Sequence, residues 1–229
     1  MYEEVFDDRK QTEMRRFFCD KLSKWGCLKS YAKGSWIDPS YCDDAFGIIV
    51  KGIVAKSIVS MQGKEKLLYL LRPGEIFGEM NLLGGGKLSY AVRAKEASQV
   101  AFVTKEVLER SVSDCPDAYG WLMHSMTRKF RIVLLQSTSY RFNDARGRIA
   151  DALLRLSACS NEAPGKSGGF PRISSTFTQH ELAQNVGCSR ITVTRQLKEF
   201  IEEGVIRMEN KKIVILNMAA LASYTDRIL

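Results

Sequence analysis

The stretch TQHELAQNVGCSRITVTRQLK, residues 178–198, decides how the C-terminal part of the chain folds. Thr178 and Glu181 have the spacing of a capping box, so a helix should begin after Thr178. Gly187 then permits a tight turn, and Ser189 can cap a second helix. The segment therefore predicts two short helices joined by a tight turn, which is a helix-turn-helix.

The two faces of this predicted helix pair differ in chemistry. The inner face is apolar: Leu182, Ala183, Val186, Val193 and Leu197. The caps and the outward face, polar or basic at all positions but one, supply the candidate DNA contacts: Thr178, Ser189, Arg190, Ile191, Thr194, Arg195 and Lys198. Arginine matches the O6 and N7 acceptors of guanine, while hydroxyl and ammonium groups bind phosphates. We therefore expect binding to double-stranded DNA, because helices that serve solubility alone need no such caps, alanine and glycine at these offsets.

The flanking segments complete a small domain. Residues 144–158 (DARGRIADALLRLSA) have the pattern of an amphipathic helix, and residues 161–171 (NEAPGKSGGFP) that of a surface loop. After Gly204, residues 205–216 form two β-rich runs around a polar turn at 209–212. We expect a hairpin that serves as a wing. Its lysines would lie beside a phosphate backbone or simply in a solvated turn.

Residues 31–103 carry the signals of an antiparallel β domain. Short apolar runs alternate with turn sequences: the runs are 46–50, 53–60 and 66–71, and the turns are Lys51-Gly52, Gln62-Gly63 and Arg72-Pro73-Gly74. This regular alternation predicts an antiparallel β-roll of the cupin or jelly-roll kind. The strands alone would also fit any other small all-β domain.

Between residues 116 and 142 the spacing of apolar residues changes to that of a long helix. Apolar residues, with one polar break, recur at alternating steps of four and three: Tyr119, Met123, Met126, Phe130, Val133, Ser137 and Tyr140. This spacing is typical of a coiled-coil seam, about 40 Å long at about 1.5 Å per residue. We expect a long helix that pairs with its twin in a homodimer; a helix buried inside one subunit is the alternative.

These segments together predict an α+β protein, and 229 residues are enough for two domains. An effector-sensing β-roll domain should occupy residues 1–113, a dimerisation helix residues 114–142, and a winged helix-turn-helix DNA-binding domain residues 143–229.

The composition fits a protein that binds nucleic acid but does not identify one. The chain has 34 Lys and Arg against 26 Asp and Glu, a formal charge of +8, which favours a polyanionic partner. No stretch approaches the roughly 18 apolar residues that span a bilayer, and the charged N-terminus lacks the order of a secretory signal. We expect a cytoplasmic protein with no membrane partner.

No part of the sequence has the pattern of a catalytic site. It lacks Ser-His-Asp, Cys-His and HExxH arrangements and contains two histidines. The glycine run at 84–86 lacks the Lys-Ser/Thr of a P-loop. We therefore do not expect an enzyme.

The order of parts, β-roll, long helix and winged helix-turn-helix, resembles the CRP/FNR family of bacterial regulators. The resemblance covers residues 31–215, and it is carried by four motifs: VGCSR at 186–190 followed by Thr192-Val193 and Arg195, GRIA at 147–150, RPGEIFGEMNLL at 72–83 and SYAVRAK at 89–95. It implies that Arg190 and Arg195 read guanines in an inverted-repeat operator, and that the bound dimer contacts RNA polymerase. Ile191 stands where the family usually has glutamate, so the operator should differ at that base pair.

The resemblance also implies an effector pocket in which an Arg-Ser pair and a glutamate hold a cyclic nucleotide. Glu79 and Ser89 are present here, but Leu88 replaces the arginine, and Val133 and Leu134 stand where the family contacts adenine. A buried phosphate without a cation is costly, so we expect a small effector other than cAMP. The candidate effector-binding residues are Leu68, Leu71, Phe77, Gly78, Glu79, Leu88, Ser89, Tyr90, Phe130, Val133 and Leu134.

This mostly apolar set suits a small organic or aromatic molecule, although plain core packing without any ligand fits it equally well. Binding would shift the packing of the long helix and re-space two recognition helices that must lie about 34 Å apart. A cyclic-nucleotide-responsive regulator remains an alternative.

A cysteine-based redox or iron-sulfur sensor is a further alternative. Cys19, Cys27 and Cys42 are too widely spaced to match the cluster of the family's iron-sulfur members, and Cys115 is the plausible distant partner, so free thiols are favoured. Haem would need His124 or His180 as a ligand. The sequence therefore predicts no definite cofactor or metal.

Overall fold

The structure is a computed structural model that describes residues 2, 5–38, 44–84, 89–159, 172–173, 177–210 and 212–226, with the backbone alone at 111–114, 159 and 172. It consists of two compact units: Asp8–Arg131, and Met1–Asp7 together with Ile132–Leu229. The boundary between them falls within one long helix, α4 (Ala118–Phe142).

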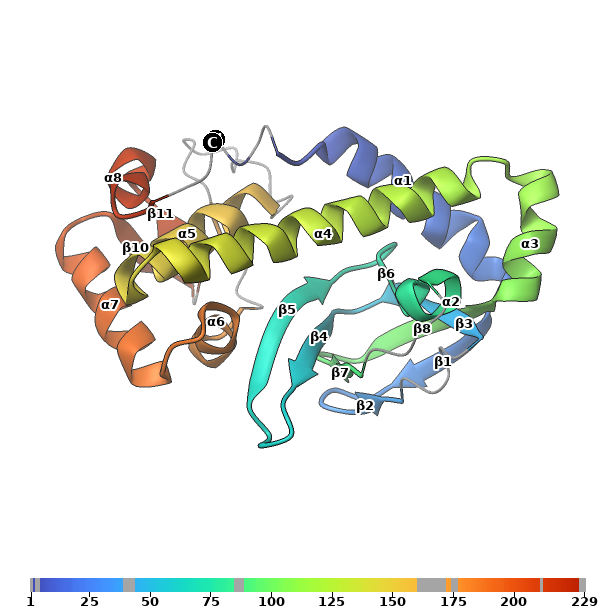
Figure 1. Cartoon of the computed structure of the whole chain (residues 1–229), viewed down its shortest axis with the longest axis horizontal. Helices are drawn as coiled ribbons and strands as arrows, with labels where there is room; N and C mark the ends of the chain where they lie inside the picture. The colour runs from blue at the N-terminus through green and yellow to red at the C-terminus, as the bar shows by residue number, and fades with distance from the viewer. Residues whose placement is uncertain are drawn as a thin grey trace. The chain divides into compact units, whose positions relative to one another are not determined.

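The first unit is an antiparallel β-roll with helices (Figure 1). Its elements are α1 (Asp8–Asp20), η2 (Leu22–Trp25), β1 (Cys27–Tyr31), β2 (Trp36–Ile37), β3 (Ala45–Lys51), β4 (Val54–Val59), β5 (Glu65–Leu71), β6 (Ile76–Phe77), α2 (Glu79–Gly84), β7 (Ala91–Ala94), β8 (Ser98–Thr104), α3 (Lys105–Asp114) and the first part of α4. The strands form two four-stranded sheets, in the orders β1-β8-β3-β6 and β2-β7-β4-β5. The predicted β-roll and long helix are confirmed.

Both faces of the β1-β8-β3-β6 sheet are buried. In β3, Ile49 packs into the core between the two sheets, whereas Phe46 and Ile48 pack on the other face. That second face is covered by α1, α3 and the start of α4, through residues such as Phe18 and Leu122. Side chains of successive strand residues point to opposite faces, so an almost continuous apolar run is what such a strand requires.

The predicted turn at Gly52 joins β3 to β4. Gly52 has φ +84°, and an added Cβ would lie 2.4 Å from Ser98 Oγ and 2.7 Å from the Ala97 carbonyl oxygen. Both the left-handed backbone and the crowding require glycine here. The sequence analysis did not predict α1, although its buried residues Gln11, Met14 and Phe18 have helical spacing.

The second unit holds the winged helix-turn-helix. Its elements after α4 are α5 (Ala145–Cys159), β9 (Arg172–Ile173), α6 (Gln179–Val186), α7 (Arg190–Glu202), β10 (Ile206–Glu209), β11 (Lys212–Ile215) and α8 (Met218–Ser223). The predicted hairpin is confirmed as β10 and β11, and β9 adds a third antiparallel strand that the sequence analysis missed. The predicted loop at 161–171 and Lys211 of the wing lie outside the described residues.

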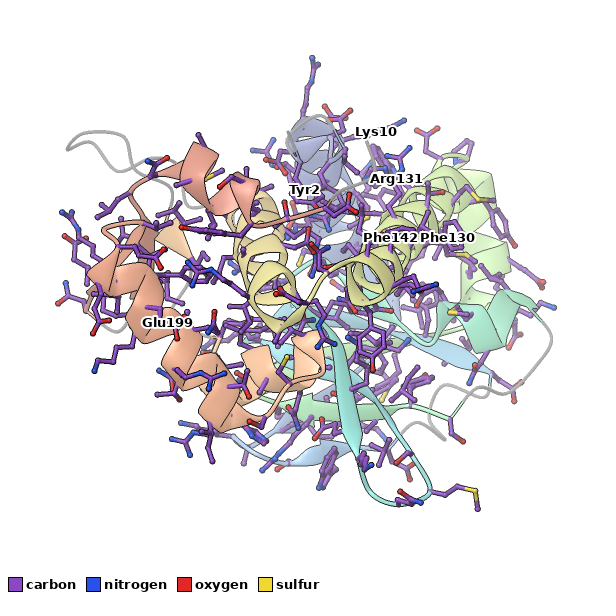
Figure 2. The ribbon with its side chains drawn as sticks, turned by 60° about the vertical axis from the view of Figure 1, so that its left-hand side comes forward. Tyr2, Lys10, Phe130, Arg131, Phe142 and Glu199 are labelled. Atoms are coloured by element: carbon purple, nitrogen blue, oxygen red, sulfur yellow. The ribbon has the colours of Figure 1, made fainter. Side chains whose placement is uncertain are left out.

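The N-terminal residues contribute to the core of this second unit. Tyr2 and Phe6 are buried in one cluster with Ile149 of α5 and Phe200 of α7. The Tyr2 hydroxyl donates to the carboxylate of Asp151, and Figure 2 labels Tyr2. Sequence patterns could not reveal this packing, because the contacting residues are far apart along the chain.

Candidate nucleic-acid interface and effector site

Local hydrogen bonds and a left-handed glycine fix where α6 and α7 begin and where α6 ends. Thr178 Oγ1 accepts from the Glu181 backbone N–H at 3.2 Å, and Glu181 Oε2 accepts from the Thr178 N–H at 2.8 Å, which confirms the capping box. Gly187 has φ +67° and ends α6 in the left-handed conformation. Ser189 Oγ then accepts from the Thr192 N–H at 3.0 Å and caps α7. The predicted helix-turn-helix is therefore confirmed in its local detail.

The inner face of the helix pair is buried as predicted. All five apolar residues, Leu182, Ala183, Val186, Val193 and Leu197, are at most 4% exposed. Thr194 Oγ1 of α7 also donates to Gln179 Oε1 of α6 at 2.8 Å. The two helices are therefore joined by apolar packing and by a polar contact at their outer edge.

The outward side of α7 exposes the candidate DNA contacts. Ile191 is 82% exposed. Arg195 lies 3.9 Å from Glu199, and Lys198 lies 3.5 Å from Glu202. Water screens such exposed ion pairs, which contribute at most about 1 kcal/mol each. Arg195 and Lys198 can therefore leave these carboxylates and bind another anion. Thr178, Ser189, Arg190 and Thr194 are also exposed.

Arg146 of α5 holds the C-terminal part of α7 in place. Its guanidinium donates to Glu199 at 3.0 Å and to Glu203 at 2.6 Å, and it lies 4.2 Å from the centre of the Tyr224 ring. Hydrogen bonds from Tyr224 and Arg146 lower the pKa of Glu203. Figure 2 labels Glu199 on this helix. The sequence analysis missed Arg146, because its partners lie more than fifty residues away.

Part of the predicted effector set gathers in the roll. Leu71, Phe77 and Tyr90 belong to the core between the two sheets. Gly78 is buried, with φ +93°, and Leu68 is half-buried.

The rest of that set lies elsewhere. Ser89 is exposed, and Phe130 is 68% exposed. Val133 and Leu134, which are 39% and 45% exposed, fall in the second unit. Leu88 lies outside the described residues.

Glu79, the first residue of α2, is a buried carboxylate with a cationic partner. Lys129 Nζ donates to Glu79 Oε1 at 2.5 Å and to the Ile76 carbonyl at 2.7 Å. Burial alone would raise the pKa of Glu79, but the ammonium groups of Lys129 and Lys56 outweigh burial and lower it. The roll unit therefore contains two cations, Lys56 and Lys129, that the sequence analysis did not place beside Glu79. A lysine inside the apolar run 53–60 was the available signal for Lys56.

The predicted alternatives based on cysteine and histidine can also be located. Cys19, Cys27, Cys115 and Cys188 carry free thiols, while Cys42 lies outside the described residues. Burial raises the pKa of the Cys19 thiol, which disfavours its reactive thiolate form. His124 Nε2 lies 3.3 Å from Gln11 Oε1, and His180 is exposed.

The residues that the structure describes contain no group of three or more His, Cys, Asp or Glu side chains placed to hold a metal ion. Within the same ranges, no helix is both long enough and apolar enough to cross a membrane.

Comparison with known proteins agrees with this arrangement of a roll and a winged helix. The model of the Crp-like helix-turn-helix domain matches residues 147–224, and that of the cyclic nucleotide-binding domain matches residues 40–114. The two matched domains define a class of regulators that join a ligand-binding roll to a DNA reader.

Whole-chain similarity identifies the family. A CRP-like cAMP-activated global transcriptional regulator of Mycobacterium tuberculosis is 31% identical over 78% of this chain and 79% of its own. The cAMP-activated global transcriptional regulator CRP of Salmonella typhimurium is 34% identical over 73% and 78%. The structure of FixK2 from Bradyrhizobium japonicum has a similar fold, with a TM-score of 0.72 over 89% of this chain and 99% of that chain at 19% identity.

This chain belongs to the CRP/FNR family, so it is a DNA-binding transcription regulator and not an enzyme.

Proposed function

We propose that the protein is a homodimeric cytoplasmic regulator that reads an inverted-repeat operator and responds to a small effector other than cAMP. The observation that carries this proposal is the exposed recognition surface of α7, made up of Arg190, Ile191, Arg195 and Lys198, in a unit that also has a β-hairpin wing. Both arginines can bind guanine O6 and N7, and Lys198 can bind a phosphate. Ile191 cannot accept a hydrogen bond from cytosine, but it can pack against a thymine methyl group.

The seam of α4 supports the homodimer. Tyr119, Met123 and Phe130 are each between 43% and 68% exposed, so much of each large side chain is left uncovered within one subunit. Their alternating spacing of four and three would let a twin helix cover all of them at once. Phe130 and Phe142, both on α4, are labelled in Figure 2. At a promoter, such a dimer would contact RNA polymerase.

The effector would bind in the roll, near Leu71, Phe77, Glu79 and Tyr90. A ligand there can act on DNA binding because α4 runs from the roll unit into the unit that carries α7. Displacing this helix would re-space the two recognition helices of a dimer.

A cyclic-nucleotide effector is the second candidate. It is favoured by the match to the cyclic nucleotide-binding domain and by the cAMP-activated relatives. The replacement of the phosphate-binding arginine by Leu88 argues against it.

Selection of genomic DNA fragments by the purified full-length protein tests the proposal. It should be done at near-physiological salt, because non-specific phosphate contacts dominate at low salt. We expect recovery of an inverted repeat with half-sites about one helical turn, 10–10.5 bp, apart. Salt-sensitive binding without sequence preference, both alone and with each effector tried, would contradict the role of Arg190 and Arg195.

A further inference from the structure

The joint between α4 and α5 is bonded to a residue that lies far along the sequence. Asn143 follows the last residue of α4. Its Nδ2 donates to the Asp226 carbonyl oxygen at 2.8 Å, and its Oδ1 accepts from the Asp226 N–H at 2.7 Å. Both residues lie outside the range 147–224 that matches the Crp-like helix-turn-helix model. The two bonds therefore need an explanation in this chain itself.

The first turn of α5 fits closely against this contact. An added Cβ on Gly147 would lie 2.7 Å from both Asn143 Oδ1 and the Tyr224 carbonyl oxygen, so glycine is needed to leave room for them. Asp144 caps the same turn, because its carboxylate accepts from the Gly147 N–H at 2.8 Å. The GRIA motif at 147–150 therefore begins with a glycine that lets residues 224–226 approach the joint.

The same residues also contact the end of the recognition helix. The Tyr224 hydroxyl donates at 2.6 Å to Glu203, which follows the last residue of α7. The Tyr224 ring stacks on the buried ring of Phe200 in α7, with 5.4 Å between the ring centres. Arg146 of α5 lies over both rings. Residues 224–226 thus connect the α4–α5 joint to α7.

We propose that residues 224–226 form a clamp that fixes α7 relative to the end of α4, with Asn143 as its positioning residue. In the proposed dimer, the geometry of the two α4–α5 joints sets the distance between the two recognition helices. The half-sites of an operator have one separation, about one helical turn. A fixed joint therefore makes the dimer selective for half-site spacing. This inference rests on the proposed function, because it concerns how the proposed dimer measures its operator.

The two hydrogen bonds of Asn143 are strong enough to produce measurable selectivity. One added base pair moves the second half-site by about 3.4 Å along the duplex and about 34–36° around it. A clamped joint resists this displacement, whereas a joint without the clamp can bend to follow it. One hydrogen bond changes an equilibrium constant roughly twofold to tenfold, and each protomer of the dimer contributes two at this joint.

The test compares the selected operator with the same operator carrying one inserted base pair between its half-sites. Affinities of the full-length wild type and of Asn143→Ala are measured by fluorescence anisotropy at near-physiological salt. We expect the wild type to prefer the selected operator by about tenfold or more, and Asn143→Ala to lower this ratio to about threefold or less. Base preference within each half-site should stay unchanged. A merely structural role of Asn143 would weaken binding to both DNAs equally and leave the ratio unchanged.

Further variants make the result specific to the clamp. Deletion of residues 225–229 removes Asp226 and should lower the ratio as Asn143→Ala does. The two changes combined should add nothing, because they remove the same bonds. Asn143→Asp keeps an acceptor for the Asp226 N–H and should retain part of the ratio. Ile173→Val, which removes one buried methyl group from β9 in the same unit, controls for lowered stability and should leave the ratio unchanged.

The outcomes separate this inference from the proposed function. If Asn143→Ala and the deletion variant keep the spacing ratio of the wild type, or if the wild type binds its operator specifically but tolerates the insertion, only the clamp is overturned. Loss of folded structure in both variants, seen by circular dichroism, would make the contact a structural one and would also overturn its positioning role. Absence of sequence-specific binding by the wild type overturns the proposed function together with the inference that rests on it.

Discussion

The two units of the protein place their charged groups in opposite environments. In the winged-helix unit, Arg195 and Lys198 of α7 lie on the surface, and their ion pairs are 3.5 Å or longer. In the roll, Lys56 and Glu79 are at most 3% exposed. Water screens the first set, whereas the second set depends on its neighbours for stability. Loss of a charge should therefore change DNA binding in one unit and folding in the other.

The largest effect is expected from Lys129→Met. The substitution leaves the buried Glu79 carboxylate without its bonded cation, which should lower the free energy of unfolding by about 3–5 kcal/mol. The loss in the free energy of unfolding can be measured by chemical denaturation, with tryptophan fluorescence as the signal. This signal reports on the roll unit, because Trp25, Trp36 and Trp121 all lie between residues 8 and 131.

The double variant Glu79→Gln/Lys129→Met is the control for this substitution. It removes the stranded charge and should recover part of the lost stability. A loss below about 1 kcal/mol in the single variant would show that water screens this pair as it does a surface pair.

Arg195→Ala should produce a smaller effect that is confined to DNA binding. We expect a loss of about 1–3 kcal/mol at one G·C pair of the operator and relaxed specificity there. Lys198→Ala is the contrast, because loss of a phosphate contact should weaken binding to all sequences and reduce the salt slope by about one. Titrations of operator variants at several salt concentrations distinguish the two. A uniform loss for Arg195→Ala would make Arg195 a phosphate contact.

The smallest effect is expected at the cap of α6. Thr178→Ala removes the acceptor of the Glu181 N–H and should destabilise the helix by about 1 kcal/mol. Faster amide hydrogen exchange within residues 179–186 would report this loss, while Thr178→Ser keeps the hydroxyl and should exchange as the wild type does. If both variants exchanged equally fast, packing of the threonine methyl group would matter more than the cap.

The difference between local and long-range contacts explains which features the sequence could predict. The caps at Thr178 and Ser189 and the turn at Gly187 depend on residues close along the chain, so their spacing alone indicated the structure. The role of Arg146 depends on Glu199 and Glu203, and that of Lys56 on Tyr90 and Glu79, all distant in sequence. Tertiary packing brings these groups together, and no local pattern encodes it.

The predicted effector residues show that sequence motifs alone do not determine which side chains gather in one place. Family resemblance indicated the region of Phe77, Glu79 and Tyr90, which the structure places in and beside one core. It also indicated Ser89 and Phe130, which the structure exposes to solvent. A motif fixes the identity of the residues, but the direction of each side chain depends on the packing around it.

The most direct test of the dimeric DNA reader compares the selected inverted repeat with the same repeat after insertion of 5 bp between its half-sites. Half a helical turn places the two half-sites on opposite faces of the duplex, beyond the reach of a symmetric dimer. We predict tight binding to the first DNA by one dimer and only weak, non-specific binding to the second, measured by fluorescence anisotropy at near-physiological salt. Equal affinity for both DNAs would show that each recognition helix binds on its own, and it would contradict the dimeric reader.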